Sequence, residues 1–526
     1  MTRATGTGAP ELADPTTTQQ ATYTHREILE ILSALLLALL TAMISSTVVS
    51  TALPTIVGEL GGQDHLSWVA SANLLTMTVS TPLWGKLSDL FGRKLMFQSA
   101  LVSFVGGSLL AGFAPGIGEL IAGRAIQGIG AGGMYSLTQV ILGDIVEPRE
   151  RGRYAGYTGA VFGVATVAGP LLGGFIVDTG WLGWRWCFFA VIPLAVIAFA
   201  VIQKRFDLPL VRRNARIDWL GAGAVTGGAS ALMLMLSMGG QEVPWASPWT
   251  YGLGGLGVAL LALAVLAERR AADPILPPRL FRDRTFIFTS LASAFTGMAM
   301  YAVMIYMPQY LQIVKEMTPT ASGLMTLPMV MAMLVASIGS GRTVTRTGRW
   351  KLFPAVGLLL VTAGLVMLSR LHAGSGDVLI GTDLAVVGMG LGLSMQILIL
   401  AAQNAVGPAD LAATTSGVAF FRSLGGAIGV AAFGAILIGR LRVEIADGLR
   451  AAHIGGLGHV SLGEPESINR LPAPLLNIVH EAFTRAMETV FLVGVPIALL
   501  GFAAVLALRE LPLRSARSKV HLDPDS

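Results

Sequence analysis

Charged residues are scarce in this chain of 526 residues. Asp, Glu, Lys and Arg together make up 13% of it, against about 25% in soluble proteins, and this shortage argues against a soluble enzyme. The single cysteine, Cys187, cannot form a disulfide within the chain. Hydrophobic residues account for 53%, and apolar runs of about 20 residues, enough to cross a bilayer, recur between Ile28 and Leu508. These features predict an all-α membrane protein with many spans.

Motifs for catalysis and for nucleotide or metal binding are also missing. No Walker loop is present, so direct drive by ATP is not expected. A G-x-G-x-x-G pattern at residues 128–133 lies inside an apolar run rather than between a strand and a helix. A zinc-protease pattern begins at His480, but Thr484 takes the place of its second histidine. We therefore expect no catalytic residue, no metal site and no cofactor, and hence no enzyme.

The distribution of Lys and Arg predicts how the chain crosses the membrane. With a cytoplasmic amino terminus, the inner loops carry twenty cations, whereas the six short outer connections carry only Arg185, Lys315 and Arg370. This asymmetry follows the positive-inside rule and predicts a plasma-membrane protein with both termini cytoplasmic. It also accounts for the net charge of +5 without nucleic acid. The fourteen predicted spans are 28–57, 66–84, 95–114, 119–143, 154–177, 186–203, 217–238, 249–267, 286–310, 320–340, 352–371, 378–402, 412–438 and 486–508.

Two loops of similar sequence indicate an internal repeat. GKLSDLFGRK follows the second predicted span at residues 85–94, and GRTVTRTGRW follows the tenth at 341–350. Gly, a base, Gly and Arg recur 256 positions apart on the same side of the membrane, which is typical of transporters built from parallel repeats. The predicted regions are a disordered cytoplasmic tail (1–27), a six-helix bundle (28–203), a linker with two extra helices (204–285), a second six-helix bundle (286–508, with an outer loop at 439–485) and a cytoplasmic tail (509–526).

The first of these loops resembles motif A of the major facilitator superfamily. IAGRAIQGIGAGG at 121–133 is similar to the fourth-helix motif of that family, and GVATVAGPLLGG at 163–174 is similar to its antiporter motif. TALP at 51–54, WRW at 184–186, DWLG at 218–221 and QN at 403–404 resemble the fourteen-span drug:proton antiporter branch. The resemblance implies two parallel six-helix bundles with two extra helices between them, and proton-driven export of a bulky compound by alternating access.

The motif A loop is predicted to form a latch at the cytoplasmic face, between elements that must separate in the inward-open state. Its glycines permit a tight turn, and Asp89 can pair with a nearby base such as Arg93. The alternative is a surface loop whose charges only set orientation. The second copy has Thr345 in place of the acid, so it should latch more weakly. The predicted latch residues are Gly85, Lys86, Asp89, Gly92, Arg93 and Lys94.

Arg124 lies inside the fourth predicted span, where an unpaired guanidinium costs about 2.5–3.5 kcal/mol even on insertion scales. On a helix it shares a face with Gln127 and Tyr135, and this stripe is predicted to line a cavity. The alternative is a buried anchor between helices. Arg422, in the thirteenth span, is predicted to have the same role on the same reasoning.

Glycines crowd the fifth predicted span around Pro170. Small residues four positions apart let helices approach closely, and proline bends a helix, so a seal between the two bundles is predicted. Ordinary helix packing is the alternative, and the antiport role comes from the family resemblance. The motif residues are Gly163, Gly169, Pro170, Gly173 and Gly174.

The chain departs from its apparent relatives in the first span. Ser45 stands where the fourteen-span antiporters commonly have an acid, and serine does not titrate near neutral pH. Asp383, about six residues inside the twelfth span, becomes the leading candidate for a proton carrier, with an interfacial acid as the alternative. The other candidates, nearer to span ends, are Glu59, Glu119, Asp144 and Asp178.

Taken together, the sequence predicts secondary active export of hydrophobic or amphipathic compounds, such as drugs and antibiotics, coupled to protons. A proton-independent facilitator and a dedicated exporter of one lipid or natural product are the alternatives within transport. A receptor or scaffold without flux is the alternative outside it. The expected partners are a small substrate, protons and the lipid bilayer, with no nucleic acid.

Overall fold

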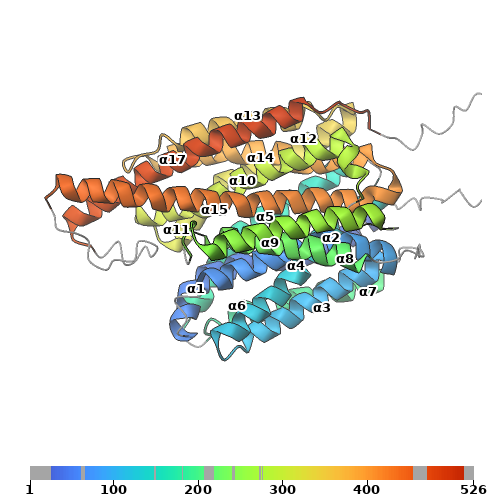
Figure 1. The fold of residues 1–526 in the computed structure, drawn as a ribbon, viewed down its shortest axis with the longest axis horizontal. Helices are drawn as coiled ribbons and strands as arrows, with labels where there is room; N and C mark the ends of the chain where they lie inside the picture. Colours follow the sequence, from blue (N-terminus) through green and yellow to red (C-terminus); the bar gives the residue numbers. More distant parts are fainter. Residues whose placement is uncertain are drawn as a thin grey trace, which may run out of the picture.

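The protein is a bundle of long, nearly parallel helices (Figure 1). The computed structural model describes residues 25–60, 66–146, 150–179, 182–205, 218–239, 243–271, 274, 277–453 and 471–513. Apart from one isolated bridge between Gly239 and Val243, the regular structure of these residues is helical. The α-helices are α1 (His25–Leu60), α2 (Leu66–Phe91), α3 (Arg93–Gly112), α4 (Ile117–Ile145), α5 (Arg151–Asp178), α6 (Trp186–Phe189), α7 (Ile192–Arg205), α8 (Trp219–Met238), α9 (Pro248–Arg270), α10 (Arg284–Ile313), α11 (Pro319–Met325), α12 (Leu327–Thr347), α13 (Leu352–Leu368), α14 (Asp377–Ala405), α15 (Leu411–Ala451) and α17 (Ala473–Leu506).

Several helices begin at residues whose side chains satisfy free backbone amides. Asp218, Ser247 and Thr318 precede α8, α9 and α11, and each accepts a hydrogen bond from the amide three residues further on. Such caps stabilise a helix start by about 1 kcal/mol. Proline follows the cap at the start of α9 and α11, where its missing amide costs nothing.

Each predicted apolar run lies in a helix, although two of the runs are broken. Run 186–203 is divided between α6 and α7, and run 320–340 between α11 and α12. The second break lies at Thr326, where α12 starts with Leu327 and has Pro328 in its first turn. By length and hydropathy, 10 of the described helices can cross a membrane, and two shorter apolar helices lie at Leu220–Leu236 and Leu352–Leu368.

The helices form two halves, each with a hydrophobic core. The first half contains α1 to α7, drawn in blue to cyan-green, and the second contains α10 to α17, drawn in yellow to red (Figure 1). The two extra helices, α8 and α9, follow the first half, and α8 rests on both halves through contacts with Val79 of α2 and Phe420 of α15. Gly92 and Gly348, at matching positions of the sequence repeat, both have positive φ angles of 92° and 72°. Glycine adopts a positive φ without strain, which explains why both positions are glycine. The two turns differ in ψ, which is 149° at Gly92 and −5° at Gly348.

The described residues of the segment predicted as a long outer loop, 439–485, are largely helical, which the sequence interpretation did not anticipate. α15 continues to Ala451 and α17 begins at Ala473, so both extend beyond the other helices at one end (Figure 1). The two extensions pack on each other through buried apolar side chains, including those of Leu441 and Phe483. The polar residues on their outer faces hid this helical pattern. Most of the predicted tails, 1–24 and 514–526, lies outside the described residues.

The ends of the bundle differ in charge. We call the end that carries Arg93, Arg151, Arg279 and Lys351 the basic end. At the basic end Arg279, ahead of α10, pairs with Asp410 at 2.6 Å. Lys351 at the start of α13 donates to the carbonyl oxygens of Leu506 and Leu508, near the end of α17.

Candidate functional site

The motif A residues form a cluster of charges at the basic end. Arg93 pairs with Asp89 at 2.7 Å and also with Asp144, at the end of α4, at 2.7 Å. The predicted Asp89–Arg93 pair is therefore present, and its side chains are mostly shielded, at 20% and 15% exposure. Asp89 lies beyond the predicted span, and burial raises its pKa above the usual value, although Arg93 and Lys86 oppose that shift. Lys94 donates to the carbonyl oxygen of Gln203 in α7.

This cluster does not join the two halves. α2, α3, α4 and α7 all belong to the first half, so the charges hold the basic end of that half together. The sequence interpretation placed the latch between elements that must separate, and the structure shows that the charged pair itself lies within one half. Its effect on transport stays a prediction.

Gly85 is the motif A residue that meets the second half. A Cβ atom at Gly85 would lie 2.5 Å from the Oγ of Ser416 and 3.2 Å from the carbonyl oxygen of Ala412, both in α15. The space allows only glycine, so α2 and α15 approach closely here.

A second contact between the halves involves Arg151, which the sequence analysis counted only as an orienting charge. Arg151 is 7% exposed and caps the end of α4 by donating to the carbonyl oxygens of Val146, at 2.9 Å, and Gly143. It also donates to Oε1 of Gln403 in α14 at 3.2 Å. Gln403 in turn donates to Thr415 of α15 at 3.0 Å. The QN pair at 403–404, which resembles the antiporter branch, was the sequence signal for Gln403. No sequence signal indicated that Arg151 would bind it.

Arg124 is buried, at 2% exposure, and its guanidinium binds neutral groups. It donates to Oε1 of Gln127 at 2.6 Å and to the carbonyl oxygen of Val69 at 3.3 Å. Gln127 donates in turn to Ser45 at 2.9 Å and to Ser108 at 2.8 Å. The predicted stripe of Arg124 and Gln127 is present, and Ser45, the residue in place of the usual acid, is linked to Arg124 through one amide.

Arg422 and Tyr135 meet between the halves. The Arg422 guanidinium of α15 lies 5.1 Å from the centre of the Tyr135 ring of α4, within the range of a cation–π contact. The Tyr135 ring also packs edge-on against Phe162 of α5. The Tyr135 hydroxyl and Nη2 of Arg422 are buried and have no hydrogen-bond partner in the described part of the chain.

Asp383 is buried, at 1% exposure, but it lies apart from these residues. Val387 and Gly390, one and two helical turns further along α14, pack against Gly364 and Val361 of α13. Because residues four and seven apart share a helix face, Asp383 lies on the face toward α13. Its Oδ1 has no hydrogen-bond partner among the described residues.

The other acidic candidates have different surroundings. Glu59 accepts a hydrogen bond from the Trp184 indole at 2.8 Å, and Asp144 pairs with Arg93. Glu119 is exposed in the first turn of α4. The side chain of Asp178 lies outside the described residues.

The glycines of α5 divide between two neighbouring helices. A Cβ atom at Gly163 would lie 2.3 Å from Val330 of α12, in the other half, and a Cβ atom at Gly174 would lie 3.9 Å from Thr320. Cβ atoms at Gly169 and Gly173 would meet α1. α5 is thus closely packed against α1 and against the other half, and its role as a seal stays a prediction. The side chain of Pro170 lies outside the described residues, so the predicted kink stays a prediction.

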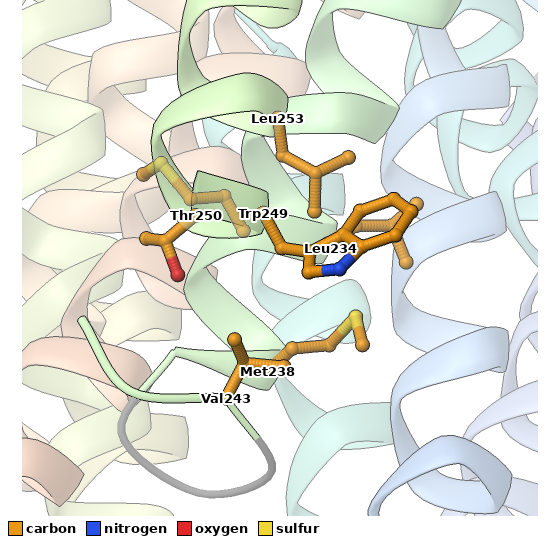
Figure 2. A pocket seen from close by; sticks show the side chains of 7 residues that line it. Leu234, Met238, Val243, Trp249, Thr250 and Leu253 are labelled. Carbon is orange, nitrogen blue, oxygen red and sulfur yellow. The ribbon is translucent and has the colours of Figure 1, made fainter. Parts of the chain in front are cut away.

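A groove of about 380 Å³ lies on the extra pair of helices, between α8 and α9 (Figure 2). Apolar side chains line it, and the labelled Trp249 and Leu253 of α9 lie across from Leu234 and Met238 of α8. The hydroxyl of Thr250 already donates a hydrogen bond to the carbonyl oxygen of Pro244. Apart from that hydroxyl and the indole nitrogen of Trp249, the side chains that line the groove are apolar. The junction of the two halves, with its buried arginine and tyrosine, is the better candidate for a transport site.

Two helical halves that meet around buried polar residues define a membrane transporter. The Major Facilitator Superfamily model matches residues 35–430, and the chain belongs to this family of transporters. It is therefore not an enzyme, as expected.

Curated relatives and solved structures agree with this assignment. Rv1877 of Mycobacterium tuberculosis, an uncharacterized MFS-type transporter, is 38% identical over 90% of this chain and 67% of its own length. The multidrug transporter protein MdtP of Bacillus subtilis is 31% identical over 89% of this chain and 90% of its own. The efflux pump dotC of Dothistroma septosporum is 32% identical over 88% of this chain and 80% of its own. The structure of the proton:xylose symporter XylE, 16% identical, matches with a TM-score of 0.61 over 93% of this chain and 98% of that chain.

Proposed function

We propose that this protein exports hydrophobic or amphipathic compounds, drugs and antibiotics among them, by alternating access of its two halves. Relatives named as a multidrug transporter and an efflux pump support export as the function. A dedicated exporter of one lipid or natural product is the second candidate, because a single substrate of that kind would need the same apolar surroundings.

The observation that carries the proposal is a hydrophobic layer shared by the two halves. One core cluster contains Leu39 and Phe162 of the first half together with Met300, Met333 and other residues of the second. Methionine is flexible and polarizable, so a layer rich in it can adapt to ligands of different shape. Such a layer suits substrates that share hydrophobicity rather than one structure.

The proposed topology has fourteen spans in the plasma membrane, with both termini and the basic end in the cytoplasm. The helices that occupy all fourteen predicted runs and the gathering of Lys and Arg at one end support it. In this orientation the contacts of Gly85 and Arg151 close the cytoplasmic side.

The proposed energy source is the proton gradient, with Asp383 as the carrier. Its burial without a partner for Oδ1 supports this role, because an ionised carboxylate there is costly and a bound proton removes the charge. A facilitator without proton coupling remains the competing form of the same transporter.

The test is uphill flux in everted membrane vesicles that contain the protein. A panel of amphipathic compounds is offered while the pH difference is varied at fixed membrane potential. We expect accumulation that rises with the pH difference. Flux that does not change with the pH difference would favour the facilitator. Flux no greater than that of vesicles without the protein would contradict export.

A further inference from the structure

Two arginines are buried without a matching negative charge: Arg124 within the first half and Arg422 at the junction of the two halves. Arg124 and Arg422 are both almost fully buried, at 2% and 4% exposure, and neither has an ion-pair partner in the described part of the chain. The buried acids among the described residues are Asp383, on the face of α14 toward α13, and Glu268 of the peripheral α9. Neither carboxylate neutralises the two arginines.

Arg124 and Arg422 differ in how far their hydrogen-bonding capacity is used. The Arg124 guanidinium donates to Gln127 and to the carbonyl oxygen of Val69. Nη2 of Arg422 and the hydroxyl of Tyr135 have no partner, although both are buried. Leaving a buried donor unsatisfied is costly, and more so when the group is charged. A ligand with hydrogen-bond acceptor atoms would therefore supply the partners that Arg422 and Tyr135 lack within the described part of the chain.

Packing holds this pair of side chains in position. The backbone carbonyl oxygen of Arg422 lies against Gly297 of α10, where a Cβ atom would come within 2.2 Å of it. The Tyr135 ring is fixed by its edge-on contact with Phe162, at a centroid distance of 6.2 Å. Tyr135 and Phe162 also belong to the methionine-rich layer shared by the halves. A ligand whose charged head group binds at Arg422 would thus have apolar surface beside it for its hydrophobic body.

We propose that Arg422 and Tyr135 bind the anionic head group of an amphipathic substrate, a carboxylate or sulfonate, and that the site disfavours lipophilic cations. The inference rests on the proposed export function and names the class of its substrate. A guanidinium offers paired N–H donors that match a carboxylate or sulfonate, and the Tyr135 hydroxyl adds a donor from the other half. A cation at the same place meets an unneutralised arginine in an apolar setting, where repulsion is strong.

Three probes with one hydrophobic body test this preference. Pyrenebutyrate, pyrenebutanol and pyrenebutyl-trimethylammonium share the pyrene and differ in head-group charge. Their binding to the full-length protein in nanodiscs of zwitterionic lipid is measured by fluorescence, with protein-free nanodiscs subtracted. We expect the anion to bind about tenfold more tightly than the alcohol, as a charge-assisted hydrogen bond provides, and the cation more weakly than both.

Variants connect the preference to the site. Arg422→Gln should abolish the difference between anion and alcohol, whereas Arg422→Lys should keep part of it. Tyr135→Phe keeps the ring and should weaken only the anion, by a few-fold. Arg440→Gln is the matched control, because Arg440 is exposed on the same helix, and it should change nothing. If Arg422→Gln does not fold, the Lys and Phe variants give the same comparison.

Two results would overturn the inference: equal or tighter binding of the cation, or an anion preference that survives in Arg422→Gln. Failure of the export function is recognised separately. A protein that binds the anion through Arg422 but moves no compound in vesicles keeps the site and loses the transporter assignment. One that exports cations independently of Arg422 keeps the transporter assignment and loses the anion site.

Discussion

At the scale of single residues, a small number of buried charged groups among the described residues stand out in a largely apolar interior. Arg124 reaches Ser45 only through the amide of Gln127, with distances of 2.6 and 2.9 Å. Because no acid neutralises Arg124 in the described chain, its geometry depends on neutral hydrogen bonds alone. Asp383 is a contrasting case, because it is buried within the second half and its Oδ1 has no hydrogen-bond partner among the described residues.

Replacing Arg124 tests whether its planar guanidinium is needed. Arg124→Ala removes the donors to Gln127 and Val69, so export should be lost and the melting temperature should fall. Arg124→Lys keeps a charge but not the fork that reaches two acceptors, and should retain a small part of the activity. The measurement is export rate and thermal melting at matched expression, with exposed Arg349→Ala as the control. Parental export by both variants would leave Arg124 as a packing anchor only.

Replacing Asp383 tests the proton carrier. Asp383→Asn keeps the shape but cannot release a proton, so downhill exchange should persist while accumulation driven by a pH difference disappears. Asp383→Glu, which titrates, should partly restore it. Asp377, exposed in the first turn of the same helix, provides the control Asp377→Asn. Gradient-driven accumulation by Asp383→Asn equal to that of the parent would shift the assignment to Glu119, Asp144 or Asp178.

At the scale of helices, glycine decides which elements approach each other. α5 meets α12 at Gly163 and α1 at Gly169, so one helix belongs to the core of its own half and to the junction. α2 reaches α15 at Gly85. The approaches of α5 to α12 and of α2 to α15 lie between the halves, so they are the surfaces that slide or separate in the proposed alternating access.

Adding a methyl group at the α5–α12 contact should disturb it in a way that a second change repairs. The Cβ of Gly163→Ala would lie 2.3 Å from Cγ1 of Val330, and overpacking of this kind costs about 1–3 kcal/mol. We expect a lower melting temperature and slower export, both restored by adding Val330→Ala. Gly106→Ala, where a Cβ meets nothing within 4 Å, is the control. No rescue by the second change would mean that the contact is not the cause.

At the scale of the whole molecule, contacts of different kinds hold the halves together at the basic end. Gly85 allows α2 and α15 to touch, while Arg151 ties the end of α4 to Gln403 of α14. The charged cluster of Asp89, Arg93 and Asp144 shapes the first half but does not cross to the second. Opening at this end therefore has to break the Arg151 contact.

Removing that contact should open the basic end. Arg151→Ala and Gln403→Ala should each shift the distance between spin labels at Phe91→Cys and Leu352→Cys toward longer values, in a Cys187→Ala background. Both label positions are exposed, and they lie in different halves. The double variant should change the distance by less than the sum of the two single changes, since both remove the bond between Arg151 and Gln403. Unchanged distances, measured by double electron–electron resonance, would show that other contacts close this end.

The order of residues along the chain was enough to predict the helices, the repeat and the family. These rest on local quantities: the length of apolar runs, the spacing of glycines and charges, and motifs within about ten residues. The same reasoning placed Arg124 with Gln127, which are three residues apart on one helix. It did not predict the two packed helical extensions in the described parts of 439–485, because polar residues on their outer faces concealed the helical pattern.

Contacts between distant segments were decided only by the tertiary structure. The bond from Arg151 to Gln403 spans 252 positions, and Tyr135 meets Arg422 from the other half. The sequence places both Asp383 and Arg422 inside predicted spans as charged residues. In the structure, however, Asp383 faces α13 and Arg422 faces the junction of the halves. Periodicity gives the faces of a helix but not the neighbour on each face, because that choice depends on how all the helices pack at once.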